Sequence, residues 1–355
     1  MSNPLVSVLI DTYNHERFIE QAVQSVLAQD FPSADREILV VDDGSADKTA
    51  ELLHKFAPHL RILRKMNGGQ ASAFNHGIPE CRGQIVAFLD GDDWWAPTKL
   101  SSVVAAFAAN PAVGVIGHSR IEVLPGDMRR TELVRDAPRF RIDSVAGARL
   151  FRLRKSFLGT SRMAYRAGIL KRIGHVPEAL VFEADEFLFT LGAVFSEVLL
   201  LHEPLTFYRI QGQNLYQLHS ASDAATRRKH AVITALVDAL RRRFAEESVP
   251  EDVAQTVLES VQNDADVLRL SFGEGTPLDS FRTELVNYRV NHAHASLVRR
   301  ILKYISVLPA LVLPPQHYHA FKHKLAGNPL YARVRGKVLP FHQPDHVDRS
   351  GQWGL

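Results

Sequence analysis

Short apolar runs and amphipathic stretches alternate along the first 93 residues, and this pattern leaves few folds open to the chain. Strand-like runs occupy residues 5–14, 36–45, 60–65 and 83–93, and helical stretches occupy 15–29, 47–57 and 68–81 between them. Parallel strands need a long crossover between them, which a helix usually supplies. The alternation therefore predicts an α/β fold with a mostly parallel sheet flanked by helices.

Carboxylates follow the predicted strands at the points where the strands end. Asp11 ends the first run, Asp42 and Asp43 end the second, and Asp90 and Asp92 end the fourth. Ligands of open α/β sheets bind at the carboxyl ends of the strands. The sequence therefore places its acids where a ligand would bind.

The densest group of acids lies in FLDGDDWWAP, residues 88–97. Neighbouring carboxylates repel one another unless a cation or hydrogen-bond donors offset their charge. Mg²⁺ or Mn²⁺ binds carboxylate oxygens and completes its coordination with phosphate oxygens and water. We therefore predict a divalent cation at Asp90 and Asp92. Asp93 fits this site and the N-cap of a following helix equally well.

Asp42 and Asp43, in VVDDGS, form a second acidic pair. Carboxylates accept hydrogen bonds from a ribose hydroxyl or from the ring N–H of a pyrimidine. An Asp-Gly turn explains the pair equally well. Gly68 and Gly69 lie where the backbone could approach a ligand closely, although two glycines alone are a weak signal.

Composition excludes several classes of protein. Cys81 is the single cysteine, so no internal disulfide can form, which fits a reducing compartment. No apolar run reaches the roughly 18 residues that a membrane-spanning helix needs. The first residues lack the basic leader of a signal peptide. We therefore expect a cytoplasmic protein.

The C-terminal part differs in composition from the rest. We predict a boundary near residue 222, giving domains 1–222 and 223–355, the second helical and basic. Residues 285–344 contain nine Lys or Arg, six His and no Asp or Glu, although the whole chain has a net charge of only +3. Such a stretch fits the anionic surface of a membrane, and the solvated face of a helical subdomain equally well. Basic charge without a recognition motif does not support nucleic-acid binding.

Four segments match a known family together and in order: VSVLIDTYNHERFIEQAVQSVLAQ, EILVVDDGSADKT, NGGQASAFNHGI and GQIVAFLDGDDWWAPTKL. With them, residues 4–215 resemble the inverting glycosyltransferases of family 2, which have the Rossmann-like GT-A fold. The resemblance implies a metal-dependent enzyme that moves a sugar from a nucleotide diphosphosugar, usually a UDP-sugar, to an acceptor hydroxyl. It also implies a role in cell-surface polysaccharide or glycolipid assembly. A lipid-linked glycan acceptor would suit an enzyme held at the inner face of the membrane by residues 285–344.

The resemblance assigns roles to residues at matching positions. It implies that Asp92 is the metal ligand. The residues implied to contact the nucleotide and the donor sugar are Thr12, Tyr13, Asn14, Asp42, Asp43, Gly69, Asn75, Asp90 and Arg209. Gln211 stands where the family commonly has a histidine, so we predict no metal ligand there.

The family needs one more acid, which removes the proton of the acceptor hydroxyl. The matching stretch is FEADEFLFTL, residues 182–191, where Glu-Ala-Asp-Glu replaces the usual Glu-Asp pair. We rank Asp185 first as this base, Glu186 second and Glu183 third. Without the resemblance, an acid that favours the dipole of its own helix would be the simpler interpretation of Asp185.

The main alternative is a catalytically inactive protein that binds a nucleotide sugar or serves as a scaffold, because the Glu-Asp pair is imperfect. A nucleotidyltransferase would need a basic, glycine-rich phosphate loop after the first strand. DTYNHERF, residues 11–18, is not such a loop. The lack of predicted membrane spans favours addition of single sugars over processive synthesis.

Overall fold

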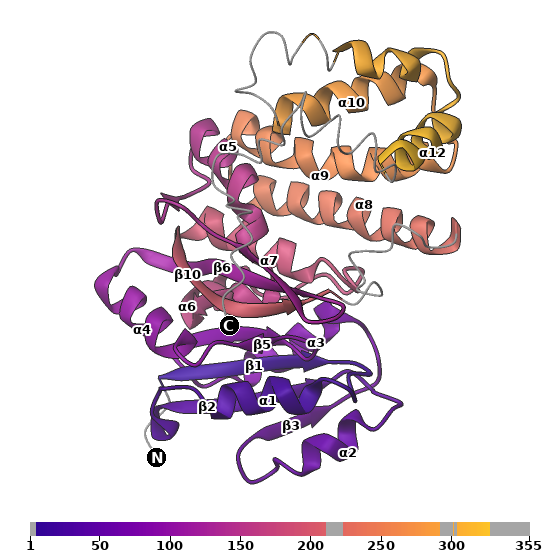
Figure 1. Ribbon diagram of the computed structural model, residues 1–355. Coiled ribbons are helices and arrows are strands. Elements are labelled where there is room, and N and C mark those ends of the chain that lie inside the picture. Colours follow the sequence, from indigo (N-terminus) through magenta and orange to yellow (C-terminus); the bar gives the residue numbers. More distant parts are fainter. Residues whose placement is uncertain (1–4, 211–222, 292–300, 302–303, 327–355) are drawn as a thin grey trace. The chain divides into compact units, whose positions relative to one another are not determined.

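The computed structural model describes residues 5–210, 223–291, 301 and 304–326 (Figure 1). The chain divides into two compact units, residues 1–217 with 347–355, and residues 218–346. The boundary that we predict near residue 222 falls outside the described residues and stays a prediction.

The first unit is built on one ten-stranded sheet in the order β3-β2-β1-β4-β9-β6-β10-β5, with β7 beside β6 and β8 beside β10. The strands are β1 (Val6–Thr12), β2 (Arg36–Asp42), β3 (Arg61–Arg64), β4 (Ile85–Asp90), β5 (Trp94–Trp95), β6 (Val113–Leu124), β7 (Met128–Glu132), β8 (Arg139–Phe140), β9 (Ala164–Arg166) and β10 (Glu197–Arg209). Strands β1 to β4 pair in parallel, as predicted. Strand β9 lies antiparallel between β4 and β6, so the sheet as a whole is mixed.

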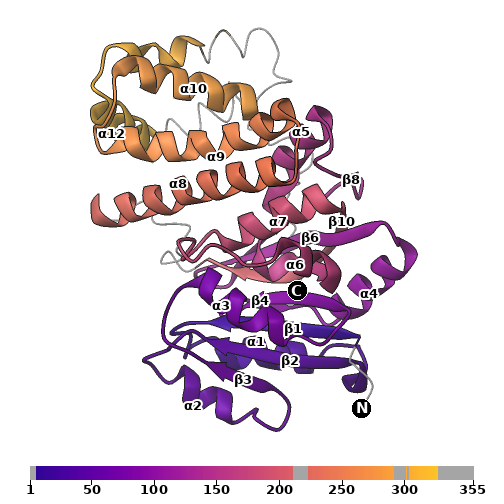
Figure 2. The same cartoon turned by 180° about the vertical axis from the view of Figure 1, so that it is seen from behind.

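Helices cover both faces of this sheet. They are α1 (Ile19–Leu27), α2 (Thr49–His54), α3 (Gln70–Gly77), α4 (Lys99–Ala109), α5 (Val145–Arg154), α6 (Ala167–Ile173) and α7 (Ala184–Phe195). Helix α1 lies in front of the sheet in Figure 1, and α3 lies in front of it in the opposite view of Figure 2. The predicted α/β class is confirmed.

Alternation along β1 explains how the sheet holds both layers, because successive side chains of a strand point to opposite faces. Val8 and Ile10 join the core cluster that contains Ile19 and Val23 of α1. Leu9 points the other way, and its Cδ1 would lie 2.6 Å from a Cβ added at Gly77 of α3. A buried strand of this kind reads as a continuous apolar run.

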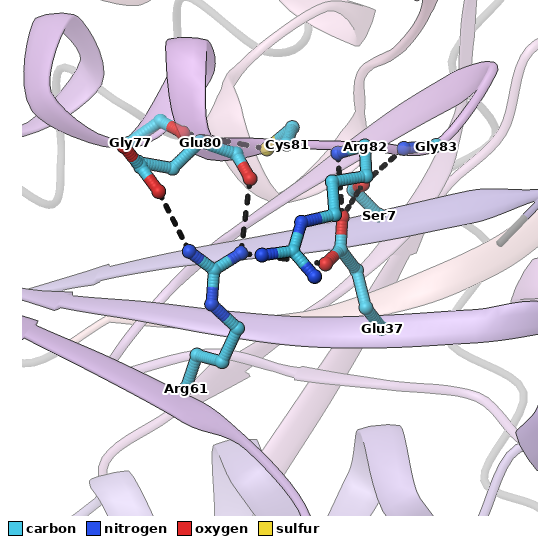
Figure 3. A network of polar contacts seen from close by, with 8 residues as sticks. All are labelled: Ser7, Glu37, Arg61, Gly77, Glu80, Cys81, Arg82 and Gly83. Carbon is cyan, nitrogen blue, oxygen red and sulfur yellow. Dashed lines mark hydrogen bonds and ion pairs between the residues drawn. The ribbon is translucent and has the colours of Figure 1, made fainter. Parts of the chain in front are cut away.

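A network of polar contacts ties the starts of the first four strands together, at the edge opposite their carboxyl ends (Figure 3). The Glu37 carboxylate accepts hydrogen bonds from Ser7 Oγ at 2.5 Å and from the backbone N–H of Arg82 at 2.6 Å. Arg61 Nη1 lies 3.5 Å from Glu37 and Arg61 Nη2 donates to Glu80 at 2.6 Å. The network stabilises the sheet at a distance from the acids of the strand ends.

We expect Glu37→Ala to lower the free energy of unfolding by about 2–3 kcal/mol, because two polar groups lose a charged acceptor. Urea denaturation of the whole chain measures the change. The control is Glu80→Ala, whose side chain is 49% exposed against 14% for Glu37. Exposed ion pairs contribute about 0–1 kcal/mol, so equal losses in the two variants would contradict this account.

The second unit is helical in its described part, which confirms the predicted helical C-terminal region. It contains α8 (Asp223–Glu246), α9 (Glu251–Ser271), α10 (Pro277–Asn291), the 3-10 turn η6 (Leu308–Leu311) and α12 (Pro315–Ala326). Helix α8 buries an apolar face that includes Leu236 and Leu240. None of the helices in the described residues is long and apolar enough to span a bilayer.

Candidate active site

Strand register brings the predicted acids together at one edge of the sheet. Asp11 of β1 is the partner of Asp90 of β4, and Thr12 is the partner of Asp42 of β2. The carboxyl ends of three adjacent parallel strands therefore carry acids side by side, as their positions in the sequence predict.

The negative charges of the carboxylates at this edge of the sheet are poorly compensated by neighbouring groups. Burial, together with the charges of Asp92 and Asp185, raises the pKa of Asp11 to about 8. Burial and the charge of Asp11 hold the pKa of Asp90 well above its usual range. Asp11 Oδ1 and Asp93 Oδ2 find no hydrogen-bond partner among the described residues. Buried carboxylates without donors fit a site that a cation completes.

The acids alone do not enclose a metal ion. Within the described residues, no three His, Cys, Asp or Glu side chains gather closely enough to hold one. Magnesium and manganese commonly take one or two carboxylates and complete their shells with phosphate and water. The donor set therefore fits a cation that binds together with a phosphate group.

Arg209, at the end of β10, fixes the loop that carries these acids. Its backbone N–H donates to Asp93 Oδ1 at 2.8 Å, and its Nε donates to the Asp92 carbonyl at 2.9 Å. Its guanidinium lies 4.5 Å from the ring centroid of Phe18 and 4.6 Å from that of Trp94. The residue thus holds the acidic loop in position from a strand more than a hundred residues away.

Asp43 and Asp42 are largely engaged by the chain itself. Asp43 accepts hydrogen bonds from Gly69 N–H at 2.7 Å, from Gly68 N–H at 3.1 Å and from Lys65 Nζ at 2.7 Å. Asp42 accepts from a backbone N–H three residues on and pairs with an arginine of β3 at 3.4 Å. The predicted contact of these acids with a nucleotide stays a prediction.

Gly69 also lies close to the backbone of a distant segment of the chain. Its φ is +84°, and a Cβ there would lie 2.6 Å from the backbone of Val181. Asn75 uses its side-chain amide to donate to the Val176 carbonyl at 2.7 Å and to accept from the Val176 N–H at 2.8 Å. These two residues hold the segment that leads to α7.

The turn after β1 presents one free aromatic side chain. Thr12 is buried, with Oγ1 3.1 Å from His15 Nδ1. Asn14 takes a left-handed φ of +56° and receives a hydrogen bond from the Ala46 N–H at 2.8 Å. Tyr13 between them is 44% exposed, so its ring is available to stack against a ligand.

Asp185 and Glu186 share the first turn of α7 but differ in their surroundings. Asp185 Oδ2 accepts from Thr160 N–H at 3.2 Å and from Thr160 Oγ1 at 3.3 Å. Burial, and then the charge of Glu186, raises the pKa of Asp185. Glu186 pairs with Lys155. Glu183 precedes the helix with a left-handed φ of +63°, a strained conformation of the kind found at functional sites.

A short turn that the sequence did not single out connects the two groups of acids. In η4 (Thr160–Arg162), Ser161 Oγ donates to Asp90 Oδ2 at 3.2 Å, and the preceding Thr160 bonds Asp185. The Ser161 carbonyl accepts three hydrogen bonds, from Trp95, Lys99 and Thr206. Such a crowded acceptor fixes the turn, so Asp90 and Asp185 are positioned by one rigid element.

Sequence reasoning placed Asp11 at a strand end without giving it a role, and it did not select Thr160 or Ser161. Asp11 had a usable signal, since it stands at the end of a predicted strand. Thr160 and Ser161 had none, because they lie in LGTSRM, some 70 residues after Asp90 and without a motif of their own.

Comparison with known proteins identifies the family of this chain. The family described as Glycosyl transferase family 2 matches residues 7–174. An uncharacterized glycosyltransferase of Nostoc sp. is 33% identical over 232 residues, which cover 64% of this chain and 70% of the relative. An uncharacterized glycosyltransferase of Rickettsia typhi is 28% identical over 59% of this chain and 64% of its own.

Solved structures share the fold. The crystal structure of S. aureus TarS has a TM-score of 0.57 at 18% identity and covers 86% of this chain and 55% of that one. A shorter TarS chain, residues 1–349 in complex with UDP-GlcNAc, has a TM-score of 0.53 at 19% identity, over 86% and 90% of the two chains. The mannosyltransferase PcManGT of Pyrobaculum calidifontis, in complex with GDP-Man and Mn²⁺, has a TM-score of 0.51 at 19% identity, over 95% and 88%. The expected GT-A fold is confirmed.

Proposed function

The chain belongs to glycosyltransferase family 2, and we propose that it transfers a sugar from a nucleotide diphosphosugar to an acceptor hydroxyl with inversion at the anomeric carbon. One observation carries the proposal. The η4 turn holds Asp90, at the strand-end acids, and Asp185, at the start of α7, on one rigid support. We assign Asp90 to the donor side and Asp185 to the acceptor side of one site, and their shared support favours this assignment.

Asp185 is the base of the proposed reaction. The acceptor oxygen forms a bond to the anomeric carbon while the bond from that carbon to the diphosphate oxygen breaks. The hydroxyl proton passes to the Asp185 carboxylate, and the nucleoside diphosphate leaves with the electron pair. The raised pKa of Asp185 supports this role, because a base whose pKa lies nearer the working pH accepts a proton more readily.

Asp92, with Asp90 beside it, would hold the divalent cation. The unpartnered oxygen of Asp11 and the raised pKa values around it support this assignment. Mn²⁺ or Mg²⁺ held there would supply positive charge to stabilise the diphosphate as it leaves. Arg209 keeps the carbonyl of Asp92 in place and so fixes the direction of the acidic loop.

For the donor we propose a UDP-sugar, with the nucleotide on the edge between Tyr13 and the glycine loop that Asp43 holds. TarS in complex with UDP-GlcNAc supports a uridine nucleotide, and PcManGT in complex with GDP-Man and Mn²⁺ supports a metal and leaves guanosine open. Thr12, Asn14 and Asp42 lie on the same edge.

The test of this proposal is a calorimetric titration with UDP, GDP and dTDP, each with and without Mn²⁺. We expect manganese-dependent binding of one nucleotide, followed by transfer from the corresponding sugar donor. No binding of any nucleotide would overturn the enzyme proposal and favour an inactive scaffold. Binding of a nucleotide without turnover would favour an inactive protein that binds nucleotide sugars.

The acceptor that we propose is a glycan or lipid-linked glycan of the cell surface, used at the cytoplasmic face of the membrane by a peripheral enzyme. The acid-free basic stretch at residues 285–344 supports this location.

Gln70 is expected to act as a positioning residue for the base. Its Nε2 donates to Thr160 Oγ1 at 3.0 Å, and its Oε1 accepts from the Ala184 N–H at 3.0 Å. Because Thr160 Oγ1 accepts from Gln70, its own proton is directed to Asp185. We expect Gln70→Leu to lower kcat by about tenfold and to leave the donor KM within about twofold, since the Thr160 hydroxyl is no longer oriented and its hydrogen bond to the base is lost.

A pH profile separates positioning from simple destabilisation. A hydrogen bond to the charged form favours that form, so its loss raises the pKa of Asp185 and moves the acid limb of kcat to higher pH. The control is Gln29→Leu, which removes a buried glutamine whose side chain makes three hydrogen bonds, with Ser25, Ala96 and Leu100. A limb that moves equally in both variants would contradict the assignment.

A further inference from the structure

The second unit exposes an unusual concentration of apolar side chains. Of the ten large apolar side chains exposed in the described part of the chain, five lie between residues 301 and 312. They are Ile301, Ile305, Leu308, Leu311 and Val312, exposed by 50%, 56%, 49%, 40% and 80%. We call them the 301–312 surface.

This surface belongs to a folded segment. Val307 and Ala310 lie between the exposed residues in sequence and are 1% and 0% exposed. The Tyr304 ring makes an edge contact with Tyr288 of α10, with centroids 6.0 Å apart. The segment is therefore packed on one side, and its five aliphatic side chains are exposed in the part of the chain that the structure describes.

The sequence that contains the surface carries basic residues and no acids. Residues 285–344 contain no acid, and the stretch from 301 to 326 carries Lys303, Lys322 and Lys324. Lys322 is paired with Glu284, the last acid before the stretch, and Lys324 is exposed. Exposed aliphatic side chains in a stretch of sequence that contains lysines and no acids match a surface that lies in the interface of an anionic bilayer.

We propose that the 301–312 surface docks this protein on a bilayer that contains anionic lipid. The aliphatic side chains enter the boundary between headgroups and acyl chains, and the lysines remain at the headgroups. A second copy of the chain fits less well. The five side chains expose on the order of 500 Å², below the roughly 800 Å² per partner of a stable interface.

Docking rests on this surface alone and does not require the transfer reaction. Its test is therefore made without nucleotide or donor, on the full chain. The probes are sedimented vesicles of phosphatidylcholine alone, and of phosphatidylcholine with one-third phosphatidylglycerol. We expect partitioning into the anionic vesicles to be at least about tenfold stronger, and to weaken as salt is raised, since salt screens the lysines.

The decisive variant is the double substitution Ile305→Ser with Val312→Ser, which is expected to lower partitioning at least about tenfold because apolar burial is lost. The matched control is Leu278→Ser with Met128→Ser, two residues that are 46% and 51% exposed outside the surface. Both double variants change exposed side chains. Their circular dichroism spectra and nucleotide binding are therefore expected to match those of the parent chain.

Three outcomes would overturn the proposal. The first is no sedimentation with either kind of vesicle. The second is an equal loss in the control double, which would point to general hydrophobicity. The third is a dimer, seen by light scattering, that becomes monomeric in the Ile305 and Val312 double variant while vesicle binding persists. This result would assign the surface to contact with a second copy of the chain.

Discussion

Replacing Asp185 by asparagine is expected to lower kcat by about 10²–10⁴-fold and to leave nucleotide binding unchanged. The range is what a positioned general base contributes to proton transfer. The amide keeps the volume of the carboxyl group, and its oxygen can still accept from Thr160 or from the Glu186 N–H. It cannot take the acceptor proton, so the loss falls on the chemical step.

The pH dependence of the parent enzyme follows from the same residue. Burial raises the pKa of Asp185 above its ordinary value, and only the deprotonated form is a base. The rate is therefore expected to rise with pH, with a midpoint above the value of about 4 for an unperturbed aspartate. Steady-state rates with saturating donor across the acid range measure this limb.

Glu186→Gln is the control for this assignment, because Glu186 lies next in sequence but is paired with Lys155. We expect it to retain most of the activity. A Glu186→Gln variant that loses 10²-fold or more while Asp185→Asn works at the normal rate would exchange the roles of the two acids.

The parts of this fold that sequence could predict are those with a local cause. Each of β1, β2 and β4 is a short apolar run, and each is followed by acids that the pattern places at a strand end. Strand β9 is only three residues long and inserts antiparallel between β4 and β6. No local periodicity distinguishes so short a strand from a loop, so the mixed part of the sheet was not predicted.

The same distinction between local and long-range causes applies to the candidate site. Residue type and strand position predicted acids at the edge, but a single position does not reveal what its side chain contacts. Asp43 is engaged by glycines 25 and 26 residues away, and Asn75 by a segment about 100 residues away. Thr160 was missed for the same reason, since its hydroxyl matters only through the fold that brings it to Asp185.

Replacing Asp92 by asparagine is expected to abolish the manganese-dependent part of nucleotide binding and to weaken binding in Mn²⁺ by at least about 100-fold. The substitution removes a negative charge and a strong oxygen ligand, and hard divalent cations depend on both. Binding without Mn²⁺ is expected to stay as in the parent chain. Calorimetric titration of both proteins, with and without the metal, measures the two parts separately.

A thermal measurement checks this assignment without a nucleotide assay. A cation that binds only the folded state raises the melting temperature, and the rise grows with the logarithm of its concentration relative to its dissociation constant. Mn²⁺ together with the nucleotide is expected to raise it in the parent chain and not in Asp92→Asn. The same substitution at Asp93 is the control, because burial raises the pKa of that carboxyl to about 8 and a neutral amide resembles its protonated form. If Asp93→Asn loses the metal response and Asp92→Asn keeps it, the ligand has been assigned to the wrong member of the acidic loop.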